Sequence, residues 1–226
     1  SQIPLLAAVE APAYAPQHLD VPAPGPPVPG PVSSLPGEVM VCIYNTHTGE
    51  TYSLTDGVER LDGKHGGVVT VAAALQEALE GKYGIKVARS DRINDENYSA
   101  SYLESEKTAR ELLAANPGAR LLLDIHRDSE KERGQSVVKV NGQEAAPILL
   151  IVGSDARRPF PNWRQNYALA LKVHGKTEQM YPGLSLGVRV KDGVYNPNLH
   201  PGALLLEMGT TMNSTEEAVL SARLLA

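Results

Sequence analysis

The sequence predicts a single α/β domain with a mostly parallel central sheet flanked by helices. Short apolar runs alternate along the chain with longer segments in which apolar residues recur at helical spacing. Runs that are apolar throughout are typical of strands buried on both faces, as in parallel sheets. The dipeptide Asn141-Gly142, which suits a type I′ turn, adds a β-hairpin insertion over residues 137–144. These observations place the domain over residues 39–226.

The first 38 residues differ in composition from the rest of the chain. They contain more than half of the 17 prolines and no lysine or arginine. Proline-dense segments favour extended polyproline geometry and behave as semi-rigid spacers. We therefore expect residues 1–38 to form a proline-rich linker, disordered or extended, that tethers the domain to an upstream segment. A ligand for a proline-recognising domain is the alternative interpretation.

The elements of the domain follow from the apolar pattern. Buried strands are expected at residues 39–44, 85–88, 121–125, 148–152, 187–190 and 203–209. Helical spacing predicts helices over residues 68–79, 99–115, 163–181 and 214–226. Gly81 and Gly84 are expected to end the first helix, because glycine is favoured just past helix ends. Ser214 and Glu217, three residues apart, form a capping-box signature at the start of the last helix.

Composition excludes several classes of protein. A net charge of -5 and the absence of a lysine and arginine stripe argue against nucleic-acid binding. The single cysteine, Cys42, lies in a predicted strand and has no partner for an internal disulfide. No run of about 18 apolar residues predicts a transmembrane helix. The chain has the composition of an ordinary globular domain with its own core.

Three of the predicted strands lead into residues that bind metals or transfer protons. His47 follows the strand at 39–44, His126 follows the strand at 121–125, and Glu207 lies near the end of the strand at 203–209. Ligands of open α/β sheets bind beyond the carboxyl ends of the strands. A hydrolytic zinc site uses about three protein ligands and a nearby carboxylate that transfers protons. His47 and His126 are therefore predicted Zn²⁺ ligands, and Glu207 the general base.

The residue patterns leave the third ligand open. Glu50 lies three residues after His47, and His65 lies just ahead of the first helix, so either or both are candidates. No His-Glu-x-x-His motif is present, so the site must be assembled from distant segments. Asp124, inside an apolar run, is either a buried structural acid or a partner that orients a ligating imidazole. The simpler alternatives are a hydrogen-bonded loop histidine and a Glu207–arginine pair.

Five stretches carry a resemblance to a known family, and they occur in the family's order along residues 39–226. The stretches are Ile43-Tyr-Asn-Thr-His-Thr-Gly-Glu-Thr-Tyr52, Asp124-Ile-His-Arg-Asp128, Tyr195-Asn-Pro-Asn-Leu-His-Pro-Gly-Ala203, Leu205-Leu-Glu-Met-Gly209 and Asn213-Ser-Thr-Glu-Glu217. On these residues the chain resembles the stage II sporulation protein P family. The resemblance implies a zinc-amidase-like fold and an N-acetylmuramoyl-L-alanine amidase related to the zinc amidases of bacterial cell-wall turnover.

The resemblance also implies a biological setting. Family members cut stem peptides from the glycan strands of peptidoglycan and remodel the sporulation septum during engulfment. They are anchored outside the cytoplasmic membrane by an N-terminal segment, and the proline-rich leader would be the linker after such an anchor. Membrane attachment is therefore expected only through a segment upstream of this chain. Stage II sporulation protein D, a lytic transglycosylase, is the partner that the resemblance implies.

Residue roles implied by the resemblance match those proposed above. His47 and His126 match the metal histidines, Glu50 matches the acid of the His-Thr-x-Glu motif, and Glu207 matches the catalytic acid. The related amidases use a His-Glu-His ligand set whose glutamate lies at the start of the first helix. This chain has His65 in that neighbourhood, so His65 remains the alternative third ligand.

Three further residues are expected to bind substrate or to support the ligands on the strength of the same motifs, namely Arg127, Asp128 and Asn196. Two alternatives to the amidase function stay open. The first is a peptidoglycan endopeptidase that cuts cross-linked stem peptides. The second is a non-catalytic scaffold that binds the cell wall.

Overall fold

The computed structural model describes residues 37–226 apart from residues 130, 158 and 194. The linker predicted over residues 1–38 lies outside the described residues, except for its last two. Within the described part, a six-stranded sheet has the order β2-β1-β3-β8-β6-β7. Its strands are β1 (Val41–Tyr44), β2 (Val87–Arg89), β3 (Leu121–Asp128), β6 (Ile148–Gly153), β7 (Ser185–Lys191) and β8 (Ala203–Thr210).

Strand direction divides the sheet into two parts. Strands β2, β1, β3 and β8 run parallel, whereas β6 is antiparallel to β8 and β7 is parallel to β6. Parallel neighbours need a crossover connection, usually a helix. Between β3 and β6 the described residues form the hairpin of β4 (Val138–Val140) and β5 (Gln143–Ala145) and the short turn η2 (Arg133–Gln135), but no α-helix, and β6 runs back. The mostly parallel sheet and the hairpin insertion are confirmed.

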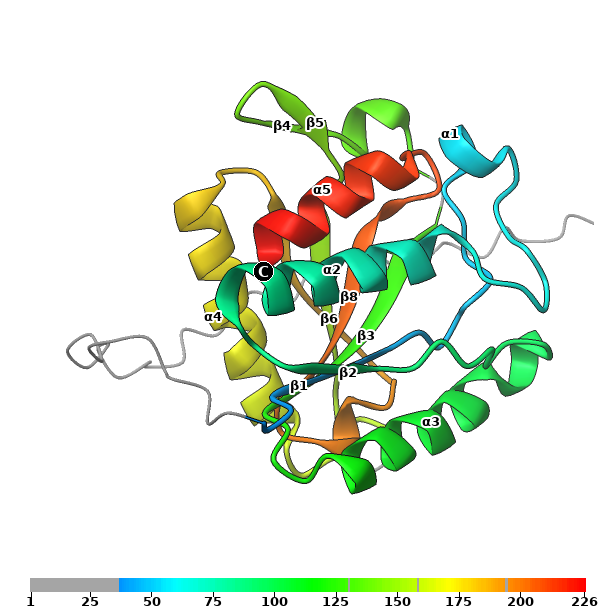
Figure 1. The fold of residues 1–226 in the computed structure, drawn as a ribbon, viewed down its shortest axis with the longest axis vertical. Coiled ribbons are helices and arrows are strands. Elements are labelled where there is room, and N and C mark those ends of the chain that lie inside the picture. The colour runs from blue at the N-terminus through cyan, green and yellow to red at the C-terminus, as the bar shows by residue number, and fades with distance from the viewer. Residues whose placement is uncertain (1–36, 130, 158, 194) are drawn as a thin grey trace, which may run out of the picture. The chain divides into compact units, whose positions relative to one another are not determined.

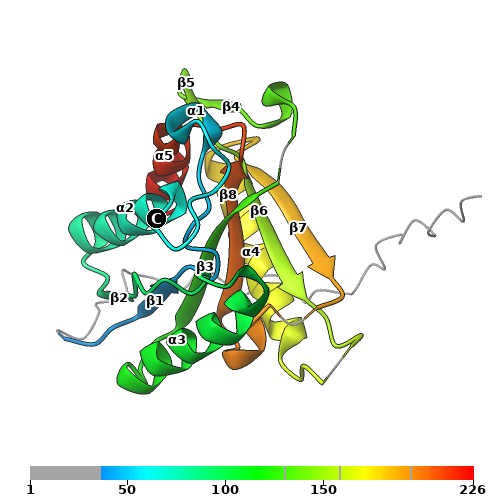
Figure 2. The ribbon, with the colours of Figure 1, turned by 90° about the vertical axis from the view of Figure 1, so that its right-hand side faces the viewer.

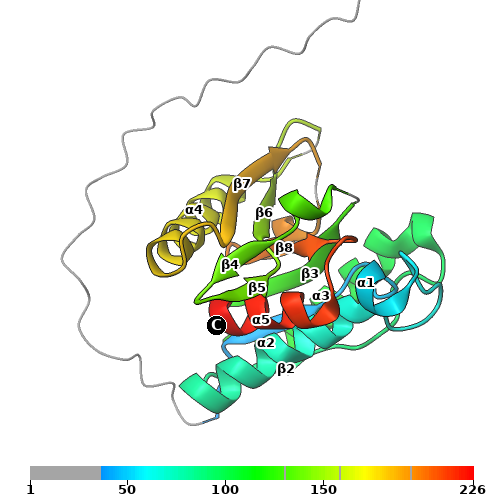
Figure 3. The same ribbon diagram turned by 90° about the horizontal axis from the view of Figure 1, so that it is seen from above.

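Helices cover the two faces unequally (Figures 1 and 3). Helices α2 (Gly67–Tyr83), α4 (Trp163–Met180) and α5 (Thr215–Leu225) contribute to the main core on one face. Helix α3 (Ser101–Ala115) packs on the other face, where Ala109 contacts a smaller cluster with Tyr44 and Leu122. The face with α3 carries the candidate site, and we call it the site face.

Local signals set the ends of several elements. Asn141 and Gly142 have φ values of 52° and 81°, as the predicted type I′ turn requires. The capping box of Ser214 and Glu217 is present at the start of α5. Gly84, with φ of 65°, ends α2, but the prediction that Gly81 also ends it was wrong because Gly81 lies inside the helix.

Strand β3 is longer than the sequence predicted. Strand β3 extends through Asp128, so His126 lies inside the strand instead of after it, because pairing with β8 continues at His126 and Asp128.

No helix among the described residues combines the length and the apolarity needed to cross a bilayer.

Candidate metal centre

The loop after β1 is bound to the two residues of β3 that precede His126. Asn45 donates from its side-chain amide to the carbonyl of Ile125 at 2.6 Å. Thr46 donates to the carboxylate of Asp124 twice, from its backbone N–H at 2.9 Å and from its hydroxyl at 2.6 Å. All of these groups are buried, so each bond satisfies a polar group that water does not reach. The loop therefore brings the next residue, His47, over β3.

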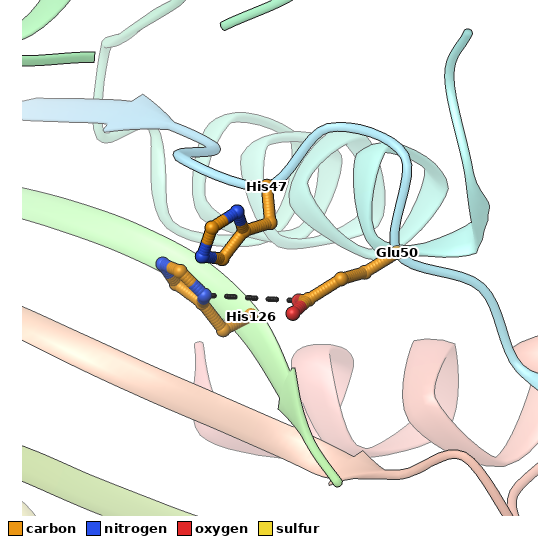
Figure 4. Close-up of side chains that lie close together, drawn as sticks. All are labelled: His47, Glu50 and His126. Atoms are coloured by element: carbon orange, nitrogen blue, oxygen red, sulfur yellow. Dashed lines mark ion pairs between the residues drawn. The ribbon is translucent and has the colours of Figure 1, made fainter. Parts of the chain in front are cut away.

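Three side chains converge at this point (Figure 4). His47 and Glu50 come from the loop after β1, and His126 comes from β3. One ligand atom from each residue lies within 4.8 Å of the others, and all three residues are buried. His126 Nδ1 lies 3.7 Å from Glu50 Oε2, and the two imidazole rings meet edge to face with centroids 5.2 Å apart. Imidazole and carboxylate are both common zinc ligands.

Arg127 holds Glu50 in this arrangement. Its backbone N–H donates to Glu50 Oε2 at 3.0 Å. Its guanidinium donates to the carbonyl of Thr51 at 3.0 Å and to the carbonyl of Glu59 at 2.7 Å. Arg127 was predicted to bind substrate or to support the ligands. In the structure its guanidinium donates to the loop that carries Glu50 and, at 3.5 Å, to the carbonyl of Asp128.

Asp124 lies beside the other ligand on β3. Residues two apart on a strand share a face, so Asp124 and His126 both point to the site face. Asp124 Oδ1 lies 3.0 Å from His126 Nε2. A carboxylate in this place fixes the orientation of a ligating imidazole, which leaves Nδ1 of His126 directed at Glu50.

Glu207 comes from the neighbouring strand. It pairs in register with His126 and is 8% exposed. Its Oε2 atom has no hydrogen-bond partner among the described residues. Burial raises the pKa of Glu207 to about 7, although the charge of His126 opposes this shift. Glu207 is adjacent to the three-residue cluster but is not a member of it.

The electrostatics of the centre favour a bound cation. Burial, together with the charge of His126, lowers the pKa of His47 to about 3. Burial also acts to lower the pKa of His126, but Asp124, Glu50 and Glu207 outweigh it and raise that pKa to about 10. Three carboxylates, those of Asp124, Glu50 and Glu207, thus act on His126, and the Arg127 guanidinium lies 3.9 Å from the carboxylate of Glu50. A cation bound at this point would offset these buried carboxylates in place of the proton on His126.

Three other predicted residues lie differently. His65 is exposed, and its Nε2 lies 2.7 Å from the carbonyl oxygen of Asp91, so His65 is not brought into the cluster. Asp128 forms an ion pair with Lys131 at 2.6 Å. Asn196 is buried and donates to the Ser105 hydroxyl at 2.9 Å.

Comparison with known proteins identifies the family. The sequence model of stage II sporulation protein P matches residues 17–226. The chain belongs to this family. A stage II sporulation protein P of Bacillus subtilis (strain 168) is 35% identical over an alignment of 193 residues, and the match covers 79% of this chain and 47% of that protein. The chain thus spans about half the length of this relative.

A solved structure supports the fold. The N-acetylmuramoyl-L-alanine amidase AmiC2 of Nostoc punctiforme superposes with a TM-score of 0.51 and 15% sequence identity. The match covers 84% of this chain and 93% of the amidase. The predicted amidase-like α/β fold is confirmed, and so is the predicted family.

Sequence reasoning assigned no role to the aromatic residues around His47. Tyr98 stacks on the His47 ring with centroids 4.7 Å apart, and the guanidinium of Arg60 lies 4.0 Å from the centre of the Tyr98 ring. Tyr102 meets His47 edge to face at 5.4 Å. Tyr98 lies in the short 3₁₀ turn η1 (Tyr98–Ala100) and Tyr102 near the start of α3, and their spacing of four residues was the sequence signal that could have placed them side by side.

Proposed function

We propose that this chain is a zinc-dependent peptidoglycan hydrolase, an N-acetylmuramoyl-L-alanine amidase that releases stem peptides from glycan strands during engulfment. The observation that carries the proposal is the buried cluster of His47, Glu50 and His126, with Glu207 in register beside it. Family membership supports the sporulation setting, and the fold supports the reaction class.

The residues present are suitable for zinc. Two imidazoles and a carboxylate give three ligands and leave one position open, as in catalytic zinc sites. His47 Nδ1 is buried and lacks a hydrogen-bond partner within the described part of the chain, so it is free to take part in ligation. Zinc in such a site acts as a Lewis acid on the scissile carbonyl and activates water as a nucleophile at neutral pH. His65 remains the alternative third ligand, but its distance from the cluster favours Glu50.

The protein groups have separate roles in this proposal. Glu207 accepts the proton of the attacking water and returns it to the leaving amine, for which a pKa near the working pH is suitable. Asp124 orients His126, and Arg127 orients Glu50. Asp128 and Asn196 are still predicted either to bind substrate or to support the metal ligands. The side chain of Asn196 is buried and donates to the Tyr102 carbonyl and the Ser105 hydroxyl of helix α3. We therefore propose that Asn196 holds its own loop against α3.

The proposal extends to the cellular setting that the family suggests. We propose attachment through an anchor upstream of this chain, action outside the cytoplasmic membrane at the sporulation septum, and cooperation with stage II sporulation protein D. Family membership supports each of these points. Co-purification of the two proteins from sporulating cells is the direct check of the partner.

Zinc content tests the metal site, and two histidine variants provide a matched pair. We expect about one zinc per chain in the wild type, loss of zinc in His126→Ala, and retention of zinc in His65→Ala. Of these two histidines, His126 lies in the cluster and His65 does not. Elemental analysis after reconstitution measures this. If the His65→Ala variant lost its zinc, His65 and not Glu50 would be identified as the third ligand.

Product analysis tests the bond that is cut. Mass spectrometry of digested peptidoglycan should find intact stem peptides with free N-terminal alanine. Cross-link cleavage with peptides still attached to glycan would indicate an endopeptidase instead. Wall binding without zinc and without products would indicate a scaffold.

A further inference from the structure

Two cations lie on the site face at the far edge of the sheet from β1. Strand β7 pairs with β6 alone among the described strands, and Figure 2 shows it at the edge of the sheet. The register aligns Asp124 of β3, Leu205 of β8, Ile151 of β6 and Arg189 of β7 in one row across the sheet. Paired residues share a face, so Arg189 points to the same side as Asp124. Lys191, two residues further, does the same.

The side chains of Arg189 and Lys191 have no polar partner within the described part of the protein. Neither Arg189 nor Lys191 makes an ion pair or a side-chain hydrogen bond to a described residue. Asp192, the adjacent acid, accepts a hydrogen bond from the Ser154 hydroxyl at 3.2 Å. Arg189 is exposed, as expected for a side chain available to a ligand.

Both cations act on the acids of the candidate centre. The charge of Lys191 opposes the burial that raises the pKa of Glu207. The pKa of Asp128 is lowered against the effect of burial, mainly by Lys131 and in smaller part by Arg189. The pairing of Arg189 with Ile151 and of Lys191 with Gly153 places the two long side chains on the side of β7 that faces the metal cluster.

The arginines nearer to the cluster are already engaged. Arg127 donates to the carbonyls of Thr51 and Glu59, and Arg60 pairs with Asp62 at 2.7 Å. Between the cluster and β7 lies a buried apolar row of Leu149, Ile151 and Leu205, which packs against Tyr195. Positive charge that is open to a substrate thus lies beyond this row, on β7.

We propose that Arg189 and Lys191 form a carboxylate-binding subsite for the peptide part of the substrate. The inference rests on the proposed function, in which the substrate is a muramoyl peptide with free carboxylates. Such a peptide is repelled by a chain of net charge -5, so binding needs local positive charge. An arginine guanidinium binds carboxylates through two parallel hydrogen bonds, and a lysine adds a point charge. The scissile bond then lies at the metal cluster and the anionic peptide extends toward β7.

The test compares the binding of two probes. The probes are an N-acetylmuramoyl tripeptide with free carboxylates and the same compound with those carboxylates amidated. Binding is measured by calorimetry on the full zinc-loaded chain carrying Glu207→Gln, so that no probe is consumed. We expect tighter binding of the carboxylate probe, weakened about ten-fold by Arg189→Ala and again by Lys191→Ala, with little change for the amidated probe.

Two further variants keep the result interpretable. Arg189→Glu should bind the amidated probe more tightly than the carboxylate probe, which a general loss of folding does not produce. Lys172→Ala, on helix α4 of the opposite face, removes one charge and should change neither affinity. An unchanged carboxylate preference in the Arg189→Ala, Lys191→Ala double variant would overturn the subsite. Product analysis of the wild type tests the amidase function separately, so the two proposals can fail independently.

Discussion

The two faces of strand β8 carry different kinds of residue, although the residues are neighbours in sequence. Leu204, Leu206 and Met208 point into the main apolar core under α2 and α5. Glu207, between the last two, points to the site face beside His126. Strand β3 repeats the pattern, with Ile125 in the core and His126 in the metal cluster. Alternation along a strand thus lets one segment supply both stability and chemistry.

The two faces are also stabilised differently. On the core face, burial of leucine and isoleucine is itself favourable, by roughly 1.5–3 kcal/mol for a fully buried side chain. On the site face, burial of charged groups is costly and must be offset by pairing or by a bound ion. The raised pKa of Glu207, caused first by burial, reports that cost. We therefore expect substitutions on the site face to affect activity and those on the core face to affect stability.

The largest effect on activity is expected from Glu207→Gln. The variant keeps the shape of the side chain but cannot accept a proton, so turnover should fall by about 10²–10⁴-fold. Zinc content should stay at the wild-type level because Glu207 is outside the ligand cluster. The measurements are release of stem peptides and elemental analysis on the same protein sample.

Glu144→Gln is the matched control for this variant. Glu144 lies on β5 of the hairpin, is paired with Arg133, and loses the same charge. It should retain most of the turnover if proton transfer belongs to Glu207. Wild-type activity in Glu207→Gln would remove Glu207 from the mechanism.

The largest effect on stability is expected one residue earlier, from Leu206→Ala. Leu206 is 1% exposed in the main core, and large-to-small changes at such positions cost about 2–5 kcal/mol. Chemical denaturation should show this loss, whereas zinc content and turnover well below the unfolding transition should be nearly unchanged. Leu206→Met, which nearly conserves volume, should cost less than about 1.5 kcal/mol. A loss of activity as large as that of Glu207→Gln, in protein that is still folded, would break the division between the faces.

The sequence predicted the strands but not all of their directions. Apolar runs such as Ile148–Gly153 look the same whichever way the strand runs, so the reversal of β6 and β7 was not predictable from periodicity. The reversal depends on the hairpin between β3 and β6, where the described residues contain no α-helix. Helix ends were predictable where capping chemistry is local, as at Ser214 and Gly84.

The candidate site shows the same limit. His47, Glu50, His126 and Glu207 were identifiable because each lies in or directly after a strand pattern or matches a family motif. Contacts between distant segments were not, and these include the bonds of Arg127 to the 51–59 loop and the stacking of Tyr98 on His47. The cations of β7 face the centre only because β7 pairs with β6 in one register, which the sequence does not specify.

The smallest predicted effect lies where α5 begins, on the core side of the sheet. Glu217 accepts hydrogen bonds from the Ser214 backbone at 3.2 Å and from Asn213 at 2.7 Å, and it pairs with Arg133 at 2.7 Å. Replacing Glu217 by Gln should cost roughly 1–2 kcal/mol at neutral pH, since part of the charge is screened by solvent. Urea denaturation of variant and wild type measures this difference.

The pH dependence of that difference tests its origin. Burial acts to raise the pKa of Glu217, but the hydrogen bonds from Arg133 and Asn213 outweigh it and hold the pKa below its ordinary value. A carboxyl whose pKa is lower in the folded state stabilises the protein above its unfolded pKa of about 4.3 and loses that contribution as pH falls through the folded value. The gap between variant and wild type should therefore close in acid. Glu106→Gln, which removes an exposed i,i+4 pair with Arg110, should cost less than about 0.5 kcal/mol. A gap at Glu217 that persists unchanged in acid would mean that the shape of the side chain, and not its charge, holds the start of α5.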